Sequence, residues 1–596
     1  MTHQELRTLW TSFWEKKAHK LVSPAPLVLQ NDPTTLFTSS GMQPLIPYLN
    51  GEAHPLGKKL YNIQLCFRAV DIDEVGNNRH TTFFEMMGNW SLGDYFKEEQ
   101  LGWIWEFFTQ ELKLPKEKLY VSVFEGEGEV FADHESVKIW KKLGVADDHI
   151  HFYGSDKNWW SRSGPPNKMP VGEIGGPDSE VFYDFGEDLK IHENSPFKEK
   201  ECHPNCDCGR FLEIGNSVFI QYKKSANGSL TELPQKNVDY GGGLERILAA
   251  VNNDPDIFKT DVFSSIIRII EVETGISYDK SEKKAEMRVI ADHMKAAVFM
   301  IVSGVIPSNK EQGYMLRRLL RRAAIKTRSV SGDLPVKLFI SVGNAVLTIY
   351  DGYDGINKKE QETLVASVIS NEMNKFSQSL DNGLKYFNKY EKVDEKIAFD
   401  LFQNFGFPFE VTQELVEEKG YSLDPTRFNE HYESHKNQSR TASAGTFKGG
   451  LADQSEQVLK YHTATHLLHQ ALRDVLGPSV RQEGSNITGE RLRFDFFVDK
   501  KPDTDAFKKV EQIINEKIAE KLSVECKILP KKEAEKIGAL YFFKEKYGDE
   551  VKVYFVGDYS KEFCGGPHVQ NTGEIGSIKI TKVKKIGSNL MRIYAQ

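Results

Sequence analysis

The sequence has few cysteines and no long hydrophobic run. Six cysteines in 596 residues are too few for a disulfide framework of this size, so we expect a reducing, cytoplasmic setting. No stretch approaches the roughly 20 consecutive apolar residues of a membrane-spanning helix, and we expect no membrane association. The N-terminal residues MTHQELRTLWTSFWEKK lack an apolar signal region and include acidic side chains, which argues against a secretory or transit peptide.

An excess of positive charge is also missing. The formal net charge is −8, which argues against a general polyanion-binding protein but leaves room for a local basic face that binds RNA. The hydrophobic content of 39% and the charged content of 27% are typical of a globular chain. A length of 596 residues predicts several domains of roughly 100–200 residues each.

Residues 65–96, LCFRAVDIDEVGNNRHTTFFEMMGNWSLGDYF, carry the most specific signal in the chain. Two apolar runs separated by a polar turn predict two antiparallel strands joined by a long loop. Arg68 comes near the end of the first run, where its planar guanidinium can hold a phosphate; a hairpin with a surface arginine is the alternative. The stretch strongly resembles the second signature motif of class II aminoacyl-tRNA synthetases, in the form found in the alanyl-tRNA synthetase family.

Other segments extend this resemblance. Residues 4–20 predict an amphipathic helix, 97–112 another helix, and 119–125 and 211–222 strands. NDPTTLFTSSGM resembles the first motif of the family. VDYGGGLERILAA, residues 238–250, reads as a glycine-rich turn that opens a helix, where backbone amides favour a phosphate. Its GGGLER part resembles the third motif.

The resemblance implies two sets of binding residues in this region. The residues expected to bind ATP are Arg68, His80, Trp160, Ile214, Asn216, Gly243 and Arg246, of which Arg68 and Arg246 would be catalytic. Mg²⁺ would shield the phosphates of ATP. The residues expected to select L-alanine are Trp160, Asn216, Val218 and Asp239, the last pairing with the α-ammonium group.

The segment ECHPNCDCGR, residues 201–210, contains three cysteines within seven positions: Cys202, Cys206 and Cys208. Thiols this close can bind one metal ion, with His203 or His192 as the fourth ligand. The spacing is not the usual CxxC, and the neighbours Cys202 and His203 would find it hard to bind the same ion. A structural zinc site and a reduced loop without metal both stay open.

Residues from about 256 to 430 predict helices throughout. One of them carries four arginines at i, i+4 spacing: Arg317, Arg318, Arg321 and Arg322. The pattern fits a solvated basic face or a surface for RNA phosphates. It resembles the family's tRNA acceptor-stem domain, in which Asn309 matches the asparagine that reads the identity wobble pair. Gln403 stands where the family has an aspartate, and we expect readout with altered geometry.

A second chemical centre is predicted near the C-terminus. YHTATHLLHQALRDVLG, residues 461–477, predicts a helix with His462 and His466 on one face, and FCGGPH supplies Cys564 and His568. Together these four side chains make a plausible zinc set. HTATH with CGGPH resembles the metal site of the editing domain shared by alanyl- and threonyl-tRNA synthetases.

The resemblance also implies what this domain does. It would hydrolyse the ester of Ser- or Gly-tRNA(Ala), and Thr465 and Gln482 match polar residues of the hydrolytic site. A zinc-bound water is more acidic than free water, but four protein ligands leave zinc no open position, which favours a structural or orienting role.

The sequence therefore predicts an α+β multidomain protein. We expect a class II antiparallel sheet with flanking helices in residues 1–250, an all-α tRNA-recognition domain in 251–430, a linker in 431–450 and an α+β editing domain in 451–596. The expected activity is ligation of alanine to tRNA(Ala) with ATP, in a compact form without the family's β-barrel insert and C-terminal module, and as a monomer. A relative of threonyl-tRNA synthetase and a degenerate synthetase that binds RNA are the alternatives.

Overall fold

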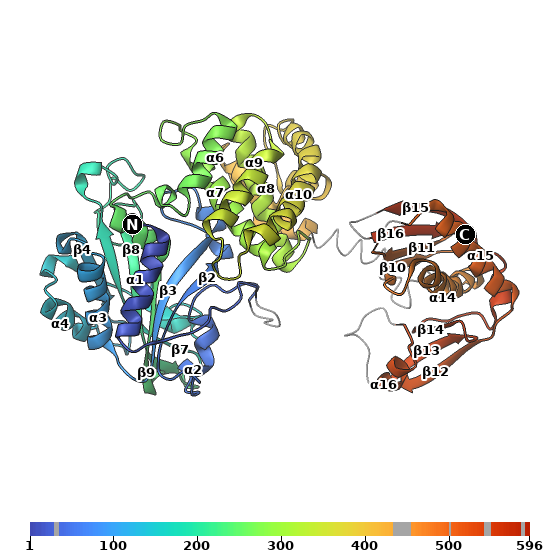
Figure 1. Ribbon diagram of the computed structural model, residues 1–596, viewed down its shortest axis with the longest axis horizontal. Coiled ribbons are helices and arrows are strands. Elements are labelled where there is room, and N and C mark those ends of the chain that lie inside the picture. The colour runs from blue at the N-terminus through green and yellow to red at the C-terminus, as the bar shows by residue number, and fades with distance from the viewer. Residues whose placement is uncertain (29–34, 433–454, 500–501, 541–549, 586–589) are drawn as a thin grey trace. The chain divides into compact units, whose positions relative to one another are not determined.

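The structure is a computed structural model that describes residues 1–596 except 29–34, 433–454, 500–501, 541–549 and 586–589. The chain forms two compact units, Met1–Leu423 and Asp424–Gln596 (Figure 1). Apart from residues 431–432, the predicted linker of residues 431–450 lies outside the described residues.

A mixed, mainly antiparallel sheet forms the centre of the first unit. Its strand order is β1-β2-β3-β9-β8-β7-β4-β5, with β6 beside β7. The strands β2, β3, β9, β8, β7 and β4 each run antiparallel to the next, and the edge strands β1 and β5 are parallel to their neighbours. The bounds are β1 (Lys20–Leu21), β2 (Lys59–Phe67), β3 (Phe83–Leu92), β4 (Leu119–Phe124), β5 (Ile150–Tyr153), β6 (Trp159–Ser161), β7 (Ile174–Asp184), β8 (Phe211–Lys224) and β9 (Leu230–Gly243).

The pairing of β2 with β3 confirms the hairpin predicted for residues 65–96. One face of this sheet is covered by helices α1 (His3–Lys16) and α3 (Lys97–Glu106). The ring of Trp10 lies 5.7 Å from that of Tyr240, and Gln100 hydrogen-bonds Asn89 and Ser217. The other helices between residues 1 and 252 are α2 (Ile46–Leu49), α4 (His134–Lys142) and α5 (Leu244–Asn252).

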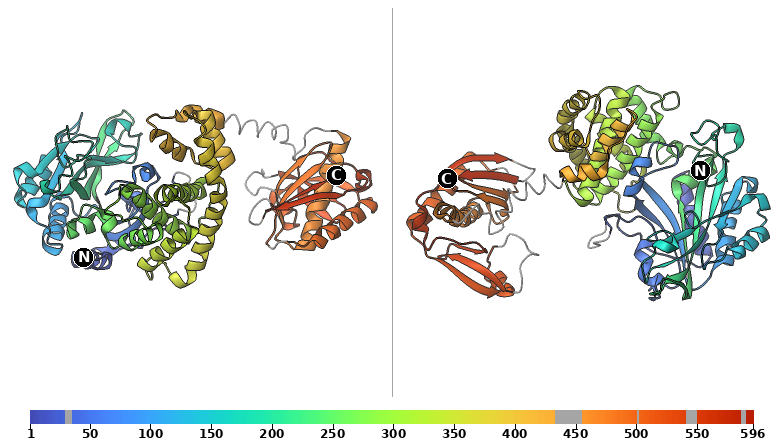
Figure 2. Two further views of the ribbon diagram at one scale, coloured as in Figure 1. Left: turned by 90° about the horizontal axis from the view of Figure 1, so that it is seen from above. Right: turned by 180° about the vertical axis from the view of Figure 1, so that it is seen from behind.

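Residues 256–423 are helical, as predicted. The helices are α6 (Ser264–Thr274), α7 (Lys284–Val302), α8 (Glu311–Ser331), α9 (Val336–Ile349), α10 (Lys358–Phe387), α11 (Glu395–Asp400) and α12 (Phe409–Glu417). Figure 2 shows α10, in yellow, as one long helix along a side of this bundle. Among the described residues no single helix is long and apolar enough to cross a membrane. Helices α8 and α9, which are bent relative to each other, are together long and apolar enough, by length and composition only.

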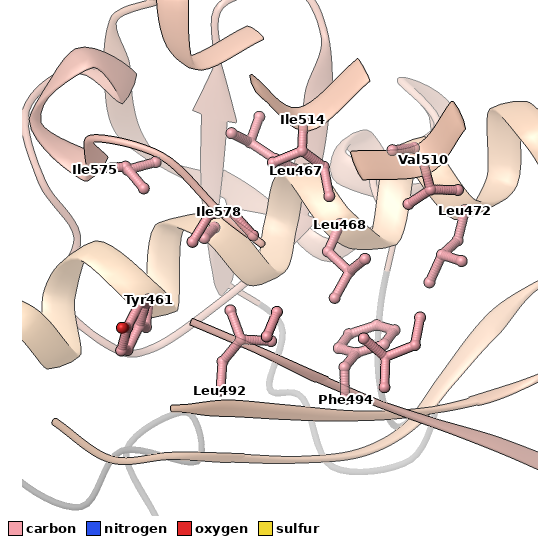
Figure 3. Packing of buried hydrophobic residues seen from close by; sticks show 14 of the residues in the cluster. Tyr461, Leu467, Leu468, Leu472, Leu492, Phe494, Val510, Ile514, Ile575 and Ile578 are labelled. Atoms are coloured by element: carbon pink, nitrogen blue, oxygen red, sulfur yellow. The ribbon is translucent and has the colours of Figure 1, made fainter. Parts of the chain in front are cut away.

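The second unit combines two sheets with several helices, and residues 425–432 near its start are also helical. One sheet has the order β10-β11-β16-β15 and the other β12-β13-β14. Figure 3 shows the core, in which Leu467, Leu468 and Leu472 of one helix lie between Phe494 of a strand and Ile514 of a second helix. The elements are α14 (Glu456–Leu476), α15 (Thr504–Ala519), α16 (Lys531–Lys536), β10 (Arg481–Ile487), β11 (Leu492–Phe497), β12 (Val524–Pro530), β13 (Glu550–Val556), β14 (Ser560–Phe563), β15 (Ile580–Lys585) and β16 (Leu590–Ala595).

Candidate active sites

Three central strands bring the residues expected to bind alanine together. Val218 on β8 lies opposite Asp239 on β9, and Asp239 lies opposite Trp90 on β3. Asn216 lies two residues before Val218 on β8 and is opposite Gly241 of β9. Because side chains alternate between the faces of a sheet, Asn216, Val218 and Asp239 share one face. It is the face opposite the one that α1 and α3 cover.

Asp239 sits at the centre of this group. The indole nitrogen of Trp90 donates a hydrogen bond to Asp239 Oδ1 over 2.7 Å. Burial raises the pKa of Asp239 to about 7, against the effect of this hydrogen bond. The residue nevertheless keeps part of its surface accessible. It can therefore meet a cationic ligand group that takes the place of water and favours the ionised carboxylate.

The surroundings of Asp239 leave little room. Trp160 packs against the apolar cluster that contains Val218 and the ring of Trp90. A Cβ atom added at Gly88 would lie 2.5 Å from that ring. Asn216 keeps part of its surface accessible, while its Oδ1 is buried without a hydrogen-bond partner. A small amino acid with one donor for Asn216 fits this arrangement.

A second carboxyl group belongs to the same row and was missed by the sequence analysis. Asp178 on β7 lies opposite Val218, and Asn158 Nδ2 donates to its Oδ1 over 2.9 Å. Burial raises the pKa of Asp178 to about 7, against hydrogen bonds from Asn158 and Asn216. The segment GGPDSEV gave the only signal, an acid on an otherwise apolar strand.

Arg68 and Arg246, two of the residues expected to bind ATP, lie toward the other end of the hairpin. Arg68 directly follows β2, and its Nε donates to the carbonyl of Ser39 over 3.2 Å. Arg246 on α5 donates from Nη1 to Glu213 Oε2 over 2.8 Å. Burial raises the pKa of Asp71, and the charges of Arg68 and Arg246 both oppose that shift. Both guanidinium groups therefore act on one carboxyl group.

His80 lies close to Arg246. Burial, together with the charges of Arg246 and Arg79, lowers the pKa of His80 to about 4, so the ring is neutral near pH 7. Asn77 Nδ2 donates to His80 Nδ1 over 2.6 Å, which leaves Nε2 as the protonated nitrogen facing Glu74 at 3.3 Å. A neutral ring with its N–H beside a cation can donate to a phosphate oxygen.

The glycine-rich segment differs from its prediction. Gly241, Gly242 and Gly243 form the end of strand β9 and not a turn, and α5 begins at Leu244 directly after them. The sheet continues through them because Met86, Met87 and Gly88 of β3 pair with all three. Ile214, expected beside ATP, is buried in β8, and its carbonyl lies 2.9 Å from a Cβ added at Gly242.

The four arginines of α8 do not form the exposed basic face that the pattern suggested. Arg322 is 3% exposed and pairs with Glu414 at 3.0 Å, and Arg318 is 6% exposed and pairs with Asp73 at 2.8 Å. Arg321 donates to Glu372 over 2.7 Å. The sequence pattern could not reveal this, because the partner acids come from distant segments.

The two residues expected to read the acceptor stem are exposed. Asn309 accepts a hydrogen bond from Arg317, and Arg317 also pairs with Glu372 at 3.2 Å. Gln403 lies in the turn of π-helix at Leu401–Phe405, and Arg321 holds that turn by donating to the carbonyl of Gly406. Arg317 and Arg321 thus tie the two exposed segments to one carboxylate, that of Glu372.

In the second unit the predicted metal ligands come together. The ligand atoms of the four side chains all lie within 4.8 Å of one another: His462, His466, Cys564 and His568. Cys564 Sγ is 3.3 Å from His462 Nε2 and 3.4 Å from His568 Nε2. Burial lowers the pKa of His462 to about 4, and neutral imidazole is the form that binds metals.

Two of the three histidines have a hydrogen-bond partner for the Nδ1 atom, and the Nδ1 atom of the third faces a carboxylate without a hydrogen bond among the described residues. His462 Nδ1 donates to the carbonyl of Pro567 over 2.9 Å, and His568 Nδ1 lies 3.2 Å from Thr463 Oγ1. His466 Nδ1 faces Glu562 at 3.4 Å. Such partners fix the ring and leave Nε2 for a metal. The donor set therefore fits a zinc ion, and Glu562 is a supporting residue that the sequence analysis missed.

The two residues expected in the hydrolytic site occupy different elements. Thr465 lies on α14, where its hydroxyl donates to the carbonyl of His462 over 2.6 Å. Gln482 lies on β10, beside an irregularity in its pairing with β11. Helix α14 packs against β10.

Comparisons with known proteins agree with this arrangement. The family described as "tRNA synthetases class II (A)" matches residues 5–481, and the "Threonyl and Alanyl tRNA synthetase second additional domain" matches residues 551–594. A protein of Treponema denticola named alanine–tRNA ligase is 44% identical, over 100% of this chain and 99% of that protein. The chain belongs to the alanine–tRNA ligase family of class II tRNA synthetases.

Family members differ in length. The alanine–tRNA ligase of Borreliella afzelii is 43% identical, over 100% of this chain and 99% of that protein. That of Thermotoga maritima is 36% identical over 712 aligned positions, which include 100% of this chain and 80% of that protein. The predicted family and fold class are confirmed, and the Thermotoga protein carries segments within the aligned region that this shorter chain lacks.

Proposed function

We propose that this member of the family ligates L-alanine to tRNA(Ala) with ATP and hydrolyses mischarged tRNA. The observation that carries the proposal is the row formed by Val218, Asp239 and Trp90, with Asn216 beside it. It offers the carboxyl group of Asp239, the amide of Asn216 and a tightly limited apolar space to the same small ligand. Relatives that share the whole chain length bear the name alanine–tRNA ligase.

The first step would be activation of alanine. A carboxylate oxygen of alanine attacks the α-phosphorus of ATP, and the bond to the β-phosphate breaks with release of pyrophosphate. Asp239 would hold the α-ammonium group, and Asn216 would orient the amino acid. Arg68 and Arg246 would stabilise the charge that develops on the phosphates. Bound Mg²⁺ would shield the phosphate charges.

The second step would transfer the alanyl group to tRNA. The 3′-terminal ribose hydroxyl attacks the carbonyl carbon of alanyl-adenylate, and AMP leaves. We propose that Asn309 and Gln403 contact the acceptor stem and that Arg317 positions Asn309, since these lie at the surface of the bundle. Arg318, Arg321 and Arg322 would hold the bundle together instead of binding phosphates.

We propose that the second unit is the editing domain. Water would attack the ester carbonyl of Ser- or Gly-tRNA(Ala) and release the amino acid. His462, His466, Cys564 and His568 would hold a zinc ion, which would fix these side chains and orient the bound 3′ end. Thr465 and Gln482 would contribute polar groups to substrate binding. The sites would occupy residues 1–250 for ligation, 251–430 for tRNA recognition and 451–596 for editing.

Compartment and assembly are part of the same proposal. The six cysteines are free, and four of them offer thiols to the two groups of metal-binding side chains, as is typical of the reducing cytoplasm. A monomer stays the predicted state. Sedimentation that gives a stable dimer would contradict it.

Alanine-dependent exchange of pyrophosphate into ATP tests the proposal. We expect exchange with alanine, weaker exchange with serine and glycine, and none with threonine. The variant Trp90→Phe removes the donor to Asp239 together with part of the ring beside it, and should raise the KM for alanine without changing that for ATP. Exchange with threonine in preference to alanine would support a threonyl-type enzyme, and no exchange with any amino acid would support the RNA-binding alternative.

A further inference from the structure

A second group of metal-binding side chains lies in the first unit, in the loop between β7 and β8. The ligand atoms of four side chains lie within 4.8 Å of one another: His192, Cys202, Cys206 and Cys208. Cys202 Sγ is 3.9 Å from Cys208 Sγ, and Cys206 Sγ is 3.6 Å from His192 Nδ1. All three cysteines are free thiols.

These distances match a tetrahedral zinc site. With Zn–S bonds of about 2.3 Å and Zn–N bonds of about 2.0–2.1 Å, tetrahedral geometry places two sulfurs about 3.8 Å apart and a sulfur and a nitrogen about 3.6 Å apart. A disulfide would need sulfurs at about 2.05 Å. The Cys202–Cys208 and Cys206–His192 distances are those of ligands around one ion, and all four ligand atoms lie within 4.8 Å of one another.

Hydrogen bonds with neighbouring backbone groups orient two of the four ligands, His192 and Cys208. His192 Nε2 donates to the carbonyl of Lys200 over 3.0 Å, which leaves Nδ1 to face the thiols. The backbone N–H of Arg210 donates to Cys208 Sγ over 3.4 Å, a contact that holds the sulfur in place. His203, the other candidate, is engaged elsewhere, because its Nδ1 lies 2.8 Å from the hydroxyl of Tyr153.

We infer that His192, Cys202, Cys206 and Cys208 bind a structural Zn²⁺ ion that clamps the loop against the hairpin carrying the second motif. Three thiolates and one imidazole favour zinc over hard cations such as Mg²⁺. The site is separate from the editing centre, which belongs to the other unit of the chain.

The loop between β7 and β8 contacts the hairpin close to His80, so a metal ion in the loop would affect the ATP side of the site. Arg79, the neighbour of His80, donates to the carbonyl of Asp207 over 2.8 Å. A Cβ atom at Gly209 would lie 3.0 Å from Arg79 Nη1, so the loop backbone touches this side chain closely. Asn205 Nδ2 lies 3.5 Å from Glu180 on β7. A loop fixed by zinc therefore positions Arg79 and, through it, His80.

Metal content of the full-length protein tests the site without reference to its activity. We expect about two zinc ions per chain, one for each group of ligands. Cys206→Ser should lower the content to about one, Cys564→Ser should also give about one, and the matched control Cys526→Ser, an exposed cysteine outside both groups, should keep both. One zinc in the wild type, unchanged in Cys206→Ser, would overturn the inference.

X-ray absorption at the zinc edge gives an answer even where a variant fails to fold. The wild type should show equal numbers of sulfur and nitrogen ligands on average, because a Cys₃His site and a CysHis₃ site are both filled. A spectrum with one sulfur for three nitrogens would mean that only the editing centre holds zinc, and the cysteines of the loop would then be reduced and without metal.

The positioning role rests on the proposed function and has its own readout. In Cys206→Ser the KM for ATP should rise about 10-fold or more, while the KM for alanine stays within about twofold, because the loop touches the hairpin on the ATP side. Equal changes in both constants would contradict positioning but leave the zinc site intact. A wild type that lacks pyrophosphate exchange would refute the proposed function and leave the zinc count unaffected.

Discussion

Arg322 donates from Nη1 to Nε2 of His293 over 2.9 Å in the interior of the first unit. His293 Nδ1 in turn lies 2.9 Å from Asp292 Oδ2, and Asp292 accepts hydrogen bonds from the backbone and hydroxyl of Thr82. Burial lowers the pKa of His293, in keeping with a neutral ring. Because the carbonyl of Thr82 accepts from the backbone of Arg68, this network joins α8 to the catalytic hairpin.

Removal of Arg322 should therefore affect stability. Arg322→Ala breaks a buried ion pair with Glu414 and leaves His293 without its donor, so the free energy of unfolding of the first unit should fall by about 3–5 kcal/mol. The midpoint of urea unfolding measures this. Arg317→Ala is the matched control, because Arg317 lies five residues before Arg322 on α8 and its side chain is more exposed. It should cost under about 1 kcal/mol but reduce charging of tRNA. Equal losses of stability in both variants would contradict the structural role of the buried network around Arg322.

Asp239→Asn should weaken the use of alanine. Loss of a charged hydrogen-bonding partner for the α-ammonium costs about 1.5–3 kcal/mol, so kcat/KM for alanine should fall about 10- to 150-fold. The KM for ATP should change little. Pyrophosphate exchange at varied alanine concentration measures both. A fall in ATP affinity equal to that for alanine would show that Asp239 does not select the amino acid.

The pH dependence follows from the same residue. Burial raises the pKa of Asp239 from the ordinary 3.8 to about 7, and only the ionised form pairs with an ammonium group. The value of kcat/KM for alanine should rise with pH up to about pH 7 and then level off. Asp178 also has a pKa of about 7, so Asp178→Asn is needed as a control and should keep the rise. A profile that stays flat from about pH 5.5 to about pH 8 would contradict the role of Asp239.

The raised pKa of Asp239 also affects stability, which should fall with rising pH where kcat/KM for alanine rises. The pKa of Asp239 is 3.8 in the unfolded chain and about 7 in the folded protein. Between these two pH values the folded protein still holds the proton that the unfolded chain has released. The contribution of this group to the free energy of unfolding therefore falls as the pH rises through that window. Asp239→Asn should remove this dependence in urea unfolding followed from acidic to neutral pH. An unaltered slope would place the shift on another group.

The editing centre gives a prediction that separates the two units. His466→Ala should lose one zinc ion per chain and slow the release of serine from Ser-tRNA(Ala) by about 100-fold, since ligands of a metal site act together. Alanine-dependent pyrophosphate exchange serves as the internal control and should stay unchanged. Full deacylation by a zinc-free variant would refute the proposed centre.

The sequence was sufficient where motifs and periodicity agree with local structure. The hairpin of β2 and β3, the amphipathic helix α1 and the helix carrying His462 and His466 were predicted from pattern alone. The resemblance supplied the residues that the register then brought together, such as Val218 and Asp239.

The rest depends on contacts between distant segments. The arginine pattern of α8 is the same for a solvated face and a buried network, and only the position of Glu414 and Glu372 decides between them. That His192 and not His203 lies with the three cysteines likewise follows from how the loop turns, because His192 precedes Cys202 by ten positions. Pairing with β3 kept Gly241 to Gly243 in a strand.

Charging of tRNA(Ala) with radioactive alanine tests the central claim most directly. The acceptor stem would carry either the wobble pair or a Watson–Crick replacement, and Asn309→Ala would be measured beside the wild type. We predict charging of the wobble form alone by the wild type, with Asn309→Ala impaired. Equal charging of both stems would contradict the role of Asn309 and Gln403, and no charging of either stem would contradict the proposed ligase itself.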